Sequence, residues 1–573
     1  MRARLRVGAL LAACGAAALC APAAWPASRP AERARHAMIA GPEPVAVEEG
    51  LRVLGAGGNA VDAAVTMAFV LAVTYPQAGN LGGGGYMLVS PARGEPYVVD
   101  FRETAPAAAE RGMFLDAEGR VVPRLSLDTY KGSGVPGTVA GLALALRKGG
   151  SRSWRDAIEP AIRAARRGFA VPRGLEEDLL DHAPRLERWP ASRAVFFKDG
   201  RPVREGEILA QPDLAATLET LALEGPDAFY RGAPARALAA DMRAHGGLID
   251  EEDLAGYRAI ERPPLRGEYR GFTVLTVPPS SSGGVVLLQT LAMLGGRPIA
   301  PLGHNSSATI HLVSEALRRA FADRAHWLGD PAFTTIPLPG LVSPAYAASR
   351  LRDFDPSRAT LSSSIRHGDP EGAEPGATTH FSVLDRHGGA VSTTVTLNEL
   401  FGSGAVAGRL GYLLNDEMDD FSAAPGTPNL FGLVGSEANA IAPGKRMLSS
   451  MCPTILLEKE AGRRPGVAMV LGSPGGPAII TSVLQAILNV VDFRMELQAA
   501  VDAPRFHHQW LPDQIALDEG AFPADVIEAL RRRGHHVVER APRGDVQAIL
   551  VDRDQGWILG ASDPRRYGVA RGE

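Results

Sequence analysis

The stretch Thr378-Thr379-His380-Phe381 and its continuation to Thr396-Leu397-Asn398 decide how the central part of this 573-residue chain folds. Residues 378–385 and 391–397 alternate in the manner of β-strands, and residues 386–389 supply the turn region between them. A turn of three or five residues would set Thr378 opposite Thr396, whereas a turn of four residues would shift the register by one. Because a threonine-rich strand can also reflect β-propensity alone, the hairpin by itself does not establish a site.

Thr378 is a candidate N-terminal nucleophile. A threonine hydroxyl is a weak nucleophile at neutral pH and needs a nearby base. If the chain is cut at the Ala377-Thr378 bond, the new α-amine of Thr378 can take the proton of its own hydroxyl. The preceding residues 343–377 are polar and rich in Ser, Asp, Pro and Gly, which predicts an exposed, flexible connector. A backbone cut costs little structure in such a segment.

Length and charge bound the class of protein. A chain of 573 residues is long enough for two domains or for one large multilayer unit. Its 60 basic and 64 acidic residues are nearly balanced, which argues against a nucleic acid as the main partner.

The N-terminus resembles a secretory signal. Basic residues 1–6 precede an apolar segment from Val7 to Cys20, and small residues follow, so we expect residues 1–27 to be removed by a cut after Ala23 or Ala27. The apolar run is too short to span a bilayer. Residues 11–14 also resemble a lipoprotein cleavage box, with Cys14 as the alternative anchor. We therefore expect a periplasmic or secreted protein whose one remaining thiol, Cys452, is a small packed side chain.

Several helices and strands can be placed from the pattern. Ala60–Thr74 is apolar on nearly all faces after Asn59, which predicts a buried helix with an N-cap. The glycine run in Asn80–Tyr86 allows a sharp turn or a close backbone approach, and the alternative of a phosphate loop lacks the required Gly-Lys-Ser/Thr. Residues 150–260 have helical spacing, and a strand over 269–277 precedes two more helices. We expect helices packed on sheets.

Three polar segments are candidate binding elements. Arg102 follows the strand-like residues 97–101 and could form a two-pronged contact with a carboxylate, or else a surface salt bridge. The acidic run Asn415–Asp420 adjoins apolar residues, which favours a partly buried position over a solvated face. Gly472–Gly476 precedes an apolar helix over 478–491, whose free amides can face a developing oxyanion.

No metal or cofactor is expected. His507-His508 and His535-His536 are adjacent pairs whose side chains diverge on a strand, and neither an HExxH sequence nor paired cysteines occur.

Taken together, eight segments resemble the γ-glutamyltranspeptidase family of the N-terminal nucleophile hydrolase superfamily, and the resemblance covers nearly the whole mature chain. The segments are Asn80–Tyr86, Phe101–Glu103, Gly134–Thr138, Pro279–Gly284, Thr378–Phe381, Asn415–Phe421, Lys445–Ser450 and Gly472–Gly476.

The resemblance implies an α/β (α+β) fold, a four-layer αββα sandwich of the N-terminal nucleophile hydrolase type with helices wrapping the core. It also implies a precursor that cleaves itself at the Ala377-Thr378 bond. The large subunit, residues 28–377, and the small subunit, residues 378–573, would form one intertwined catalytic unit.

The resemblance further implies a role for each site residue. Thr378 attacks, Thr396 hydrogen-bonds its hydroxyl or amine, and a lid loop over 425–445 covers the pocket. The remaining roles are oxyanion donors (Gly475 and Gly476), ligands of a substrate carboxylate (Arg102, Ser449 and Ser450) and ligands of a substrate ammonium (Asn398, Glu417 and Asp420).

The implied activity is that of a γ-glutamyltransferase and glutathione hydrolase. Its partners would be glutathione or other γ-glutamyl compounds, with water, amino acids or dipeptides resolving the acyl-enzyme, and neither nucleic acid nor a membrane span is involved. Two alternatives stay open. A cephalosporin or glutaryl acylase would not require Glu417 and Asp420, and a non-catalytic periplasmic peptide-binding protein would remain uncut.

Overall fold

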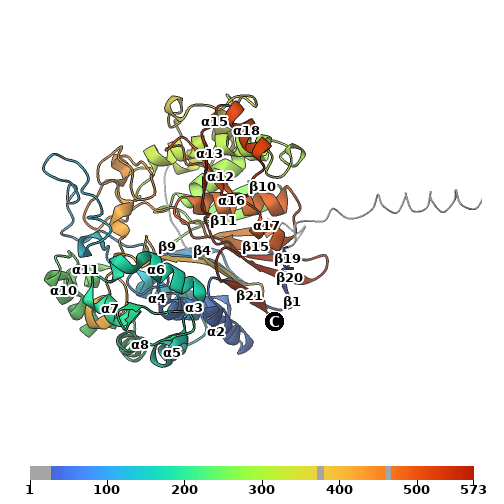
Figure 1. Cartoon of the computed structure of the whole chain (residues 1–573). Helices are drawn as coiled ribbons and strands as arrows, with labels where there is room; N and C mark the ends of the chain where they lie inside the picture. The colour runs from blue at the N-terminus through green and yellow to red at the C-terminus, as the bar shows by residue number, and fades with distance from the viewer. Residues whose placement is uncertain (1–27, 371–379, 459–465) are drawn as a thin grey trace, which may run out of the picture.

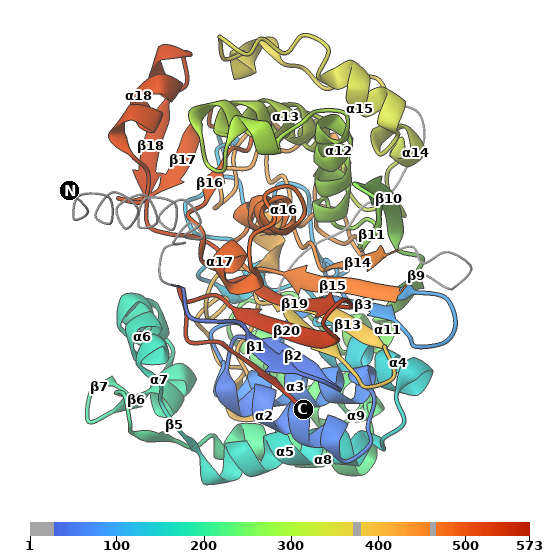
Figure 2. The ribbon, with the colours of Figure 1, turned by 90° about the vertical axis from the view of Figure 1, so that its right-hand side faces the viewer.

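Two seven-stranded antiparallel sheets lie face to face in the computed structural model, which describes residues 28–370, 380–458 and 466–573 (Figures 1 and 2). The first sheet has the order β1 (Glu32–Ala34), β20 (Trp557–Ser562), β19 (Gln547–Asp552), β15 (Gly466–Gly472), β14 (Thr454–Glu458), β11 (Phe272–Thr276) and β10 (Leu265–Tyr269). The second has the order β21 (Val569–Gly572), β2 (Met38–Gly41), β12 (Phe381–Leu384), β13 (Ala390–Thr396), β3 (Gly84–Ser90), β4 (Tyr97–Asp100) and β9 (Ile260–Arg262). Apolar side chains from both sheets, such as Tyr86 and Ile455, fill the layer between them.

Helices cover the outer face of each sheet. The first sheet packs against α12 (Gly283–Gly295), α16 (Ala478–Val491) and α17 (Leu497–Asp502), and α13 (Ser307–Trp327) packs on α12 (Figure 2). The second sheet packs against α2 (Pro44–Gly55), α3 (Ala60–Thr74) and α4 (Thr138–Gly149). The two outer layers have separate apolar cores. The predicted four-layer αββα sandwich is confirmed.

The predicted helical wrap over residues 150–260 is confirmed and lies beside the helices of the second sheet (Figure 1). It contains α5 (Trp154–Arg167), α6 (Arg173–Leu186), α7 (Pro190–Phe196), α8 (Pro212–Glu224), α9 (Asp227–Arg231), α10 (Ala233–Ala244) and α11 (Glu251–Gly256). Two short ribbons interrupt it, β5 (Phe169–Ala170) with β8 (Ile208–Leu209) and β6 (Phe197–Lys198) with β7 (Arg201–Pro202).

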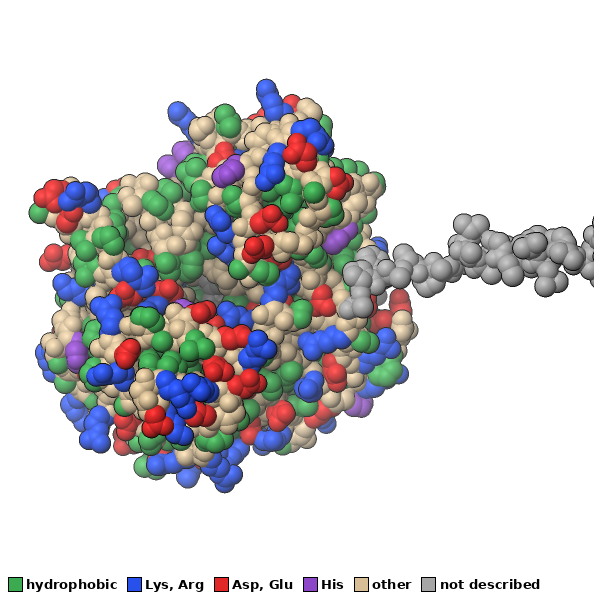
Figure 3. Space-filling view, viewed as in Figure 1, with side chains coloured by type: hydrophobic (Ala, Val, Ile, Leu, Met, Phe, Trp, Pro, Cys, Tyr) green, Lys and Arg blue, Asp and Glu red, His purple; other side chains and the backbone are tan. Residues whose placement is uncertain are grey.

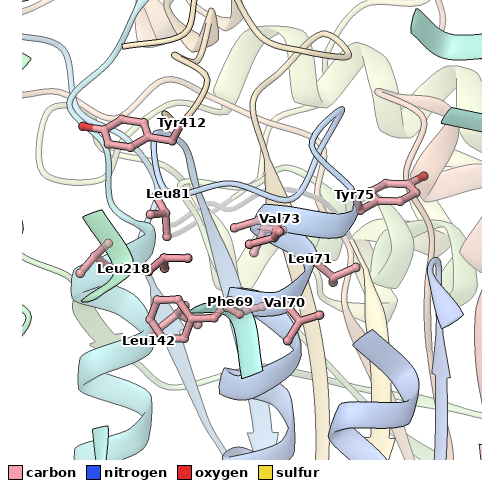
Figure 4. Packing of buried hydrophobic residues seen from close by; sticks show 14 of the residues in the cluster. Phe69, Val70, Leu71, Val73, Tyr75, Leu81, Leu142, Leu218 and Tyr412 are labelled. Carbon is pink, nitrogen blue, oxygen red and sulfur yellow. The ribbon is translucent and has the colours of Figure 1, made fainter. Parts of the chain in front are cut away.

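Helix α3 lies at the centre of the core on the second sheet, where Phe69, Val70 and Val73 pack among residues from distant segments (Figure 4). All of its residues are buried, as the apolar pattern predicts. Its start is fixed by Asn59, whose side chain accepts hydrogen bonds from the amides of Val61 and Asp62, while the Asp62 carboxylate accepts from the Asn59 amide. This reciprocal cap satisfies backbone donors that the helix leaves unpaired.

The central hairpin has the register that the sequence allows. Phe381 pairs with Thr393 and Leu384 pairs with Ala390, which leaves a five-residue loop over 385–389. His380, Ser382 and Ser392 lie on the face between the sheets, where the Ser382 hydroxyl donates to the Gln547 carbonyl at 3.1 Å. The opposite face, which includes Val383 and Val391, packs against α3.

The expectation of an exposed, flexible connector over residues 343–377 holds only in part for residues 343–370, where exposed residues are mixed with others that pack on the core. Residues 344–350 form α15 (Pro344–Arg350), which packs on α12, and Leu351 is buried. Ser362 is buried as well, and its amide donates to Asp513 at 2.7 Å. A polar composition therefore misled the prediction, because these polar side chains find partners on α13 and near the C-terminus. Residues 371–377 lie outside the described residues.

A smaller three-stranded sheet and α18 (Ala524–Arg532) complete the C-terminal part. The sheet contains β16 (Phe506–His507), β17 (Ile515–Asp518) and β18 (Val537–Arg540). Both main sheets combine strands from before and after residue 378, so the two parts of the chain are interleaved. Cys452 is buried with a free thiol, as predicted. The predicted signal, residues 1–27 with Cys14, lies outside the described residues.

The described surface carries mixed charge. Acidic and basic side chains are interspersed over the face shown in Figure 3. Among the described helices, none has both the length and the apolar character that a membrane crossing requires.

Candidate active site

A pocket of about 550 Å³ lies where β13 ends, and residues from well-separated segments line it. Seven residues that the sequence singled out line this pocket: Thr396, Asn398, Asp420, Ser449, Ser450, Gly475 and Gly476. Arg102 and Glu417 lie behind Asp420, in contact with it or with each other. Thr378 and Ala377 lie outside the described residues. The nine described candidates therefore gather in one region.

The glycine run places Thr396 at the pocket. A side chain on Gly83 would lie 2.0 Å from the Thr396 carbonyl oxygen, so only glycine permits β3 to approach β13 this closely. Asn80 then donates from its side-chain nitrogen to the same carbonyl at 2.7 Å. The predicted close backbone approach is confirmed, and it fixes the end of the central strand.

His380 is not an available base. It is 2% exposed, and its ring nitrogen Nε2 lies 2.6 Å from the Ser382 hydroxyl. Burial lowers the pKa of His380 to about 3, so the ring stays neutral near pH 7. Chemistry at this end of the hairpin therefore needs another proton acceptor.

Arg102 is the centre of a buried ion cluster. Its guanidinium contacts the carboxylate of Glu417 and, at 2.7 Å, that of Asp420, while Glu103 lies 3.4 Å away. Its Nε donates to the Met447 carbonyl at 3.3 Å. Three carboxylates thus share one guanidinium, and their mutual repulsion is only partly compensated. Because its guanidinium is already paired with these carboxylates, the binding of a substrate carboxylate by Arg102 stays a prediction.

The surplus of acid in this cluster favours a cationic ligand. Burial raises the pKa of Asp420 to about 7, with Glu417 adding to the shift and Arg102 opposing it. Burial also raises the pKa of Glu417 and Glu103, although a hydrogen bond with Thr396 acts in the other direction at Glu417. A ligand ammonium would stabilise the ionised carboxylates, so binding and deprotonation are coupled.

Asn398 and the short helix of the acidic run connect the cluster to β13. Asn398 adopts φ +78°, its amide donates to the Thr396 hydroxyl at 2.8 Å, and its side chain donates to the Asp416 carbonyl at 3.0 Å. Residues 417–420 form the 3-10 helix η6 (Glu417–Asp420). The local turn therefore brings an amide oxygen, a hydroxyl and two carboxylates together.

Ser449 and Ser450 are held by a second layer that the sequence did not reveal. The Ser282 hydroxyl donates to the Ser449 carbonyl at 2.6 Å and accepts from Arg324 Nε at 2.9 Å. Arg324 Nη2 lies 3.5 Å from the Ser450 hydroxyl. Burial lowers the pKa of Arg324 to about 10, and no carboxylate forms an ion pair with it in the described ranges. This arginine places a second buried cation behind the two pocket serines.

Gly475 and Gly476 have backbone conformations that a side chain would strain, with φ +127° and +56°. Their carbonyls accept from the amides of Ala478 and Ile479 as α16 begins. Neither glycine amide has an acceptor in the described part of the chain. Both amides are therefore available to a ligand oxygen at the pocket wall.

The predicted lid loop over residues 425–445 contributes Leu430 and Phe431 to the pocket. Asn429 donates from its side chain to Asp420 at 3.2 Å, and the Leu430 amide donates to Asp419 at 3.0 Å. A side chain on Gly476 would meet the Phe431 ring at 2.8 Å. The loop thus connects the acidic cluster to the glycine turn.

His311, Glu315 and His535 form a group that the sequence did not predict, because His311 and His535 are 224 positions apart. Their ligand atoms all lie within 4.8 Å of one another. His311 Nδ1 is 2.7 Å from His535 Nε2, and Arg318 lies 3.5 Å from His535 and 3.3 Å from Glu315. The positive charge of the Arg318 guanidinium would repel a metal ion at this position. The contacts therefore suit a hydrogen-bonded chain of side chains better than a metal site. The absence of a metal stays a prediction.

Two apposed antiparallel sheets between helical layers, with a polar pocket at the end of a central hairpin, define the class of N-terminal nucleophile hydrolases. The family model of gamma-glutamyltranspeptidase matches residues 46–573, and the chain belongs to this family of enzymes. The glutathione hydrolase proenzyme of Escherichia coli (strain K12) is 45% identical over 570 residues, which cover 98% of this chain and 97% of that protein.

Solved structures agree with this assignment. The structure of a cephalosporin acylase from Bacillus halodurans is similar with a TM-score of 0.84 and 26% identity, covering 97% of this chain and 99% of that one. Gamma-glutamyltranspeptidase from Helicobacter pylori is 42% identical with a TM-score of 0.56, covering 57% of this chain and 94% of that one. The fold is thus shared by acylases and transpeptidases, and the pocket residues must separate the two activities.

Proposed function

We propose that this chain is a self-cleaving γ-glutamyltransferase and glutathione hydrolase whose nucleophile is Thr378. Cleavage of the Ala377-Thr378 bond releases the α-amine that serves as the base. The hydroxyl oxygen of Thr378 attacks the γ-carbonyl of the donor, and its proton passes to the α-amine and then to the leaving amine. Water or an acceptor amine next attacks the γ-glutamyl ester and regenerates Thr378.

The register of the hairpin supports this role for Thr378. Residue 378 stands three positions before Phe381, and Thr396 stands three positions after its partner Thr393. If the pairing continues in the mature enzyme, Thr378 would face Thr396 at the pocket. The Thr396 hydroxyl would then be in place to orient the nucleophile or its amine.

The oxyanion and the two charged ends of the donor have matching groups at the pocket. The amides of Gly475 and Gly476 would stabilise the negative oxygen of the tetrahedral intermediate. Glu417, Asp420 and Asn398 would receive the α-ammonium. Ser449 and Ser450, with the positive charge of Arg324 behind them, would bind the α-carboxylate. Arg102 would act indirectly, by positioning the carboxylates of Glu417 and Asp420.

The acidic cluster is the observation that carries the choice of substrate. Three carboxylates around one guanidinium, two of them buried and one at the pocket wall, have an excess of negative charge, and a donor with an ammonium group relieves it. An acyl group without the ammonium, as in glutaryl or cephalosporin acylases, gains nothing from this cluster. The 45% identity to a glutathione hydrolase proenzyme supports the same choice.

The experiment compares two anilides, γ-glutamyl-4-nitroanilide and glutaryl-4-nitroanilide, which differ only in the α-amino group. We expect the wild type to release nitroaniline from the first with a kcat/KM at least about 100-fold higher than from the second, a difference of about 2.8 kcal/mol. Thr378→Ala should release it from neither. Equal rates on both anilides would favour the acylase, and binding without release by an uncut chain would favour a binding protein.

The proposal extends to location and assembly. The N-terminal segment would direct the precursor to the periplasm or outside the cell, with Cys14 lipidation as the less favoured route. Residues 28–377 and 378–573 would remain associated after cleavage, because each main sheet combines strands from both parts.

A further inference from the structure

A second group of polar residues lines the same pocket, and the donor-binding roles leave it unused. It comprises Gln77, His182, Arg543, Asp545, Arg565 and Arg566. None of these residues was singled out from the sequence. They come from the segment after α3, from α6 and from the C-terminal region.

Two buried oxygens in this group have no hydrogen-bond donor in the part of the chain that the structure describes. Asp545 is 2% exposed; its Oδ1 accepts from Gln547 at 2.8 Å, whereas its Oδ2 is unpartnered. Gln77 is fully buried and uses its nitrogen to donate to Tyr567 at 2.7 Å, whereas its Oε1 is unpartnered. An unsatisfied buried acceptor costs about 1–3 kcal/mol, so such a pair at one pocket points to a ligand with N–H donors.

The backbone of Asp545 adjoins the glycine turn that would hold the oxyanion. The Asp545 amide donates to the Ser473 hydroxyl at 2.9 Å, and a side chain on Gly475 would lie 3.3 Å from the Gly544 nitrogen. The loop 542–545 therefore packs directly on residues 473–475. A ligand held by this loop would therefore lie on the oxyanion side of the pocket.

Arg543 adds a cation at the same loop. Its side chain is exposed, it lines the pocket, and it forms no ion pair with the described residues. Arg565 and Arg566, by contrast, are already paired with Asp563 and Asp178. Arg543 is thus the arginine of this group that can bind a new carboxylate without losing an existing partner.

We propose that Asp545, Gln77 and Arg543 form the subsite for the amine component of the reaction, a free amino acid or dipeptide. Asp545 Oδ2 and Gln77 Oε1 accept hydrogen bonds from the amino group, and Arg543 binds the carboxylate. The leaving dipeptide occupies this subsite first, and the acceptor occupies it afterwards. This inference rests on the proposed transferase function, because it requires an acyl-enzyme that an amine can resolve.

The subsite gives acceptor binding a pH dependence. Burial raises the pKa of Asp545 to about 8, Asp563 adds to the shift, and Arg566, Arg505 and Gln547 oppose it. Tyr75 also faces this carboxyl group. The carboxylate that accepts a hydrogen bond from the attacking amine, and can take the proton that the amine loses, is therefore populated only as the pH rises through about 8. The KM for the acceptor should fall over the same range.

The test separates transfer from hydrolysis. With γ-glutamyl-4-nitroanilide as donor at about pH 9, where Asp545 is ionised, we expect Asp545→Asn to raise the KM for glycylglycine at least about 10-fold, and to change kcat/KM for hydrolysis by a smaller factor. Arg543→Ala should raise the KM for glycylglycine but not for glycylglycine amide, which lacks the carboxylate. Arg540→Ala, an exposed arginine outside the pocket, is the matched control.

Three outcomes would overturn the inference. An unchanged acceptor KM in Asp545→Asn would mean that water alone satisfies the carboxylate. A proportional loss of transfer and hydrolysis, together with a lower Tm, would mean that Asp545 only supports the fold. Equal effects of Arg543→Ala on both acceptors would remove the carboxylate contact.

Calorimetric titration of the purified wild type and Asp545→Asn with glycylglycine tests the subsite without turnover. Heat of binding in the wild type that is lost in the variant supports the subsite, and equal heats contradict it. If the wild type binds glycylglycine but never hydrolyses the donor, the proposed function fails while the subsite stands.

Discussion

At the residue scale, the balance of charge around Arg102 explains what the pocket can bind. One guanidinium contacts Glu103 and Glu417, which are buried, and Asp420, which lies at the pocket wall. Burying unequal numbers of opposite charges is costly unless a proton or a ligand compensates. The cluster therefore lacks one positive charge, which a substrate ammonium supplies.

Replacing Asp420 by Asn tests this balance. The variant keeps the size of the side chain but removes one negative charge, so the advantage of a donor with an ammonium should shrink. We expect the ratio of kcat/KM for γ-glutamyl-4-nitroanilide to that for glutaryl-4-nitroanilide to fall at least about 10-fold, or about 1.4 kcal/mol. Asp116→Asn, at a half-buried aspartate outside the pocket, is the control. A ratio that stays at the wild-type value would show that Asp420 does not contact the ammonium.

Site residues could be predicted from the sequence where a local motif contains them. They could not be predicted where contacts between distant segments bring a residue to the site. The candidates Ser449, Gly475 and Asp420 do line one pocket. No local pattern marks Arg324 or Asp545, because an arginine inside a helix and an aspartate in a loop are both common in protein sequences. Their place at the pocket depends on partners more than 40 positions away.

At the element scale, the caps and turns set the geometry of the pocket. The bounds of α3 were predicted from its all-round apolar pattern and its N-cap. The five-residue hairpin loop was one of the two lengths compatible with a Thr378–Thr396 pair. The segment 343–370 was predicted poorly, because α15 is short and its packing depends on α12.

Asn59→Ala should destabilise the enzyme without altering its chemistry. The substitution removes the hydrogen bonds to the Val61 and Asp62 amides and the bond from Asn59 Nδ2 to the Gly149 carbonyl at 2.8 Å. Loss of such a cap costs about 0.5–2 kcal/mol. We expect a lower Tm and an unchanged kcat at 25 °C in the same preparation. An unchanged Tm would show that α3 is fixed by packing alone.

Gly476→Ala should reduce catalysis far more than stability. The backbone φ of residue 476 is +56°, which is unfavourable for alanine, and the added methyl group would lie 2.8 Å from the Phe431 ring. The glycine turn must therefore shift. A displaced oxyanion donor costs about 2.7–4 kcal/mol of barrier, which is a fall in kcat of about 100- to 1,000-fold. Gly57→Ala is the matched control, since φ is +85° there and the space around it is open. Equal kcat values for the two variants would exclude the turn from catalysis.

At the scale of the whole molecule, interleaving of the chain explains how a cut precursor could stay folded. Strands from before residue 378 pair with strands from after it in both sheets, and the layer between the sheets is apolar. The four-layer arrangement itself could be expected only through the family resemblance. Alternating patterns predict strands, but they do not say which sheet a strand joins.

Acid should destabilise the molecule through its buried histidines. Burial lowers the pKa of His535 to about 3, and His311 and Arg318 add to this shift. Because the pKa is lower in the native state, His535 stays neutral there at pH values below about 6.5, at which the unfolded chain binds a proton. The stability from neutral His535 is complete above pH 6.5 and is lost as the pH falls toward 3.

His535→Gln removes this titration and should flatten the acid response. We expect the Tm difference between the wild type and the variant to narrow steadily from pH 6.5 to pH 4, as measured by differential scanning fluorimetry. Raised carboxyl pKa values, such as that of Asp420, act in the opposite direction in both proteins and cancel in the comparison. A constant Tm difference over this range would contradict the assignment.

The most direct test of the account is the N-terminal sequence of the smaller polypeptide in the purified mature protein. The account predicts two polypeptides that stay associated, the smaller of 196 residues and beginning Thr378-Thr379-His380, with Thr378→Ala remaining a single inactive chain. An active wild-type enzyme that consists of one uncut polypeptide, or whose new terminus lies at another residue, would contradict it.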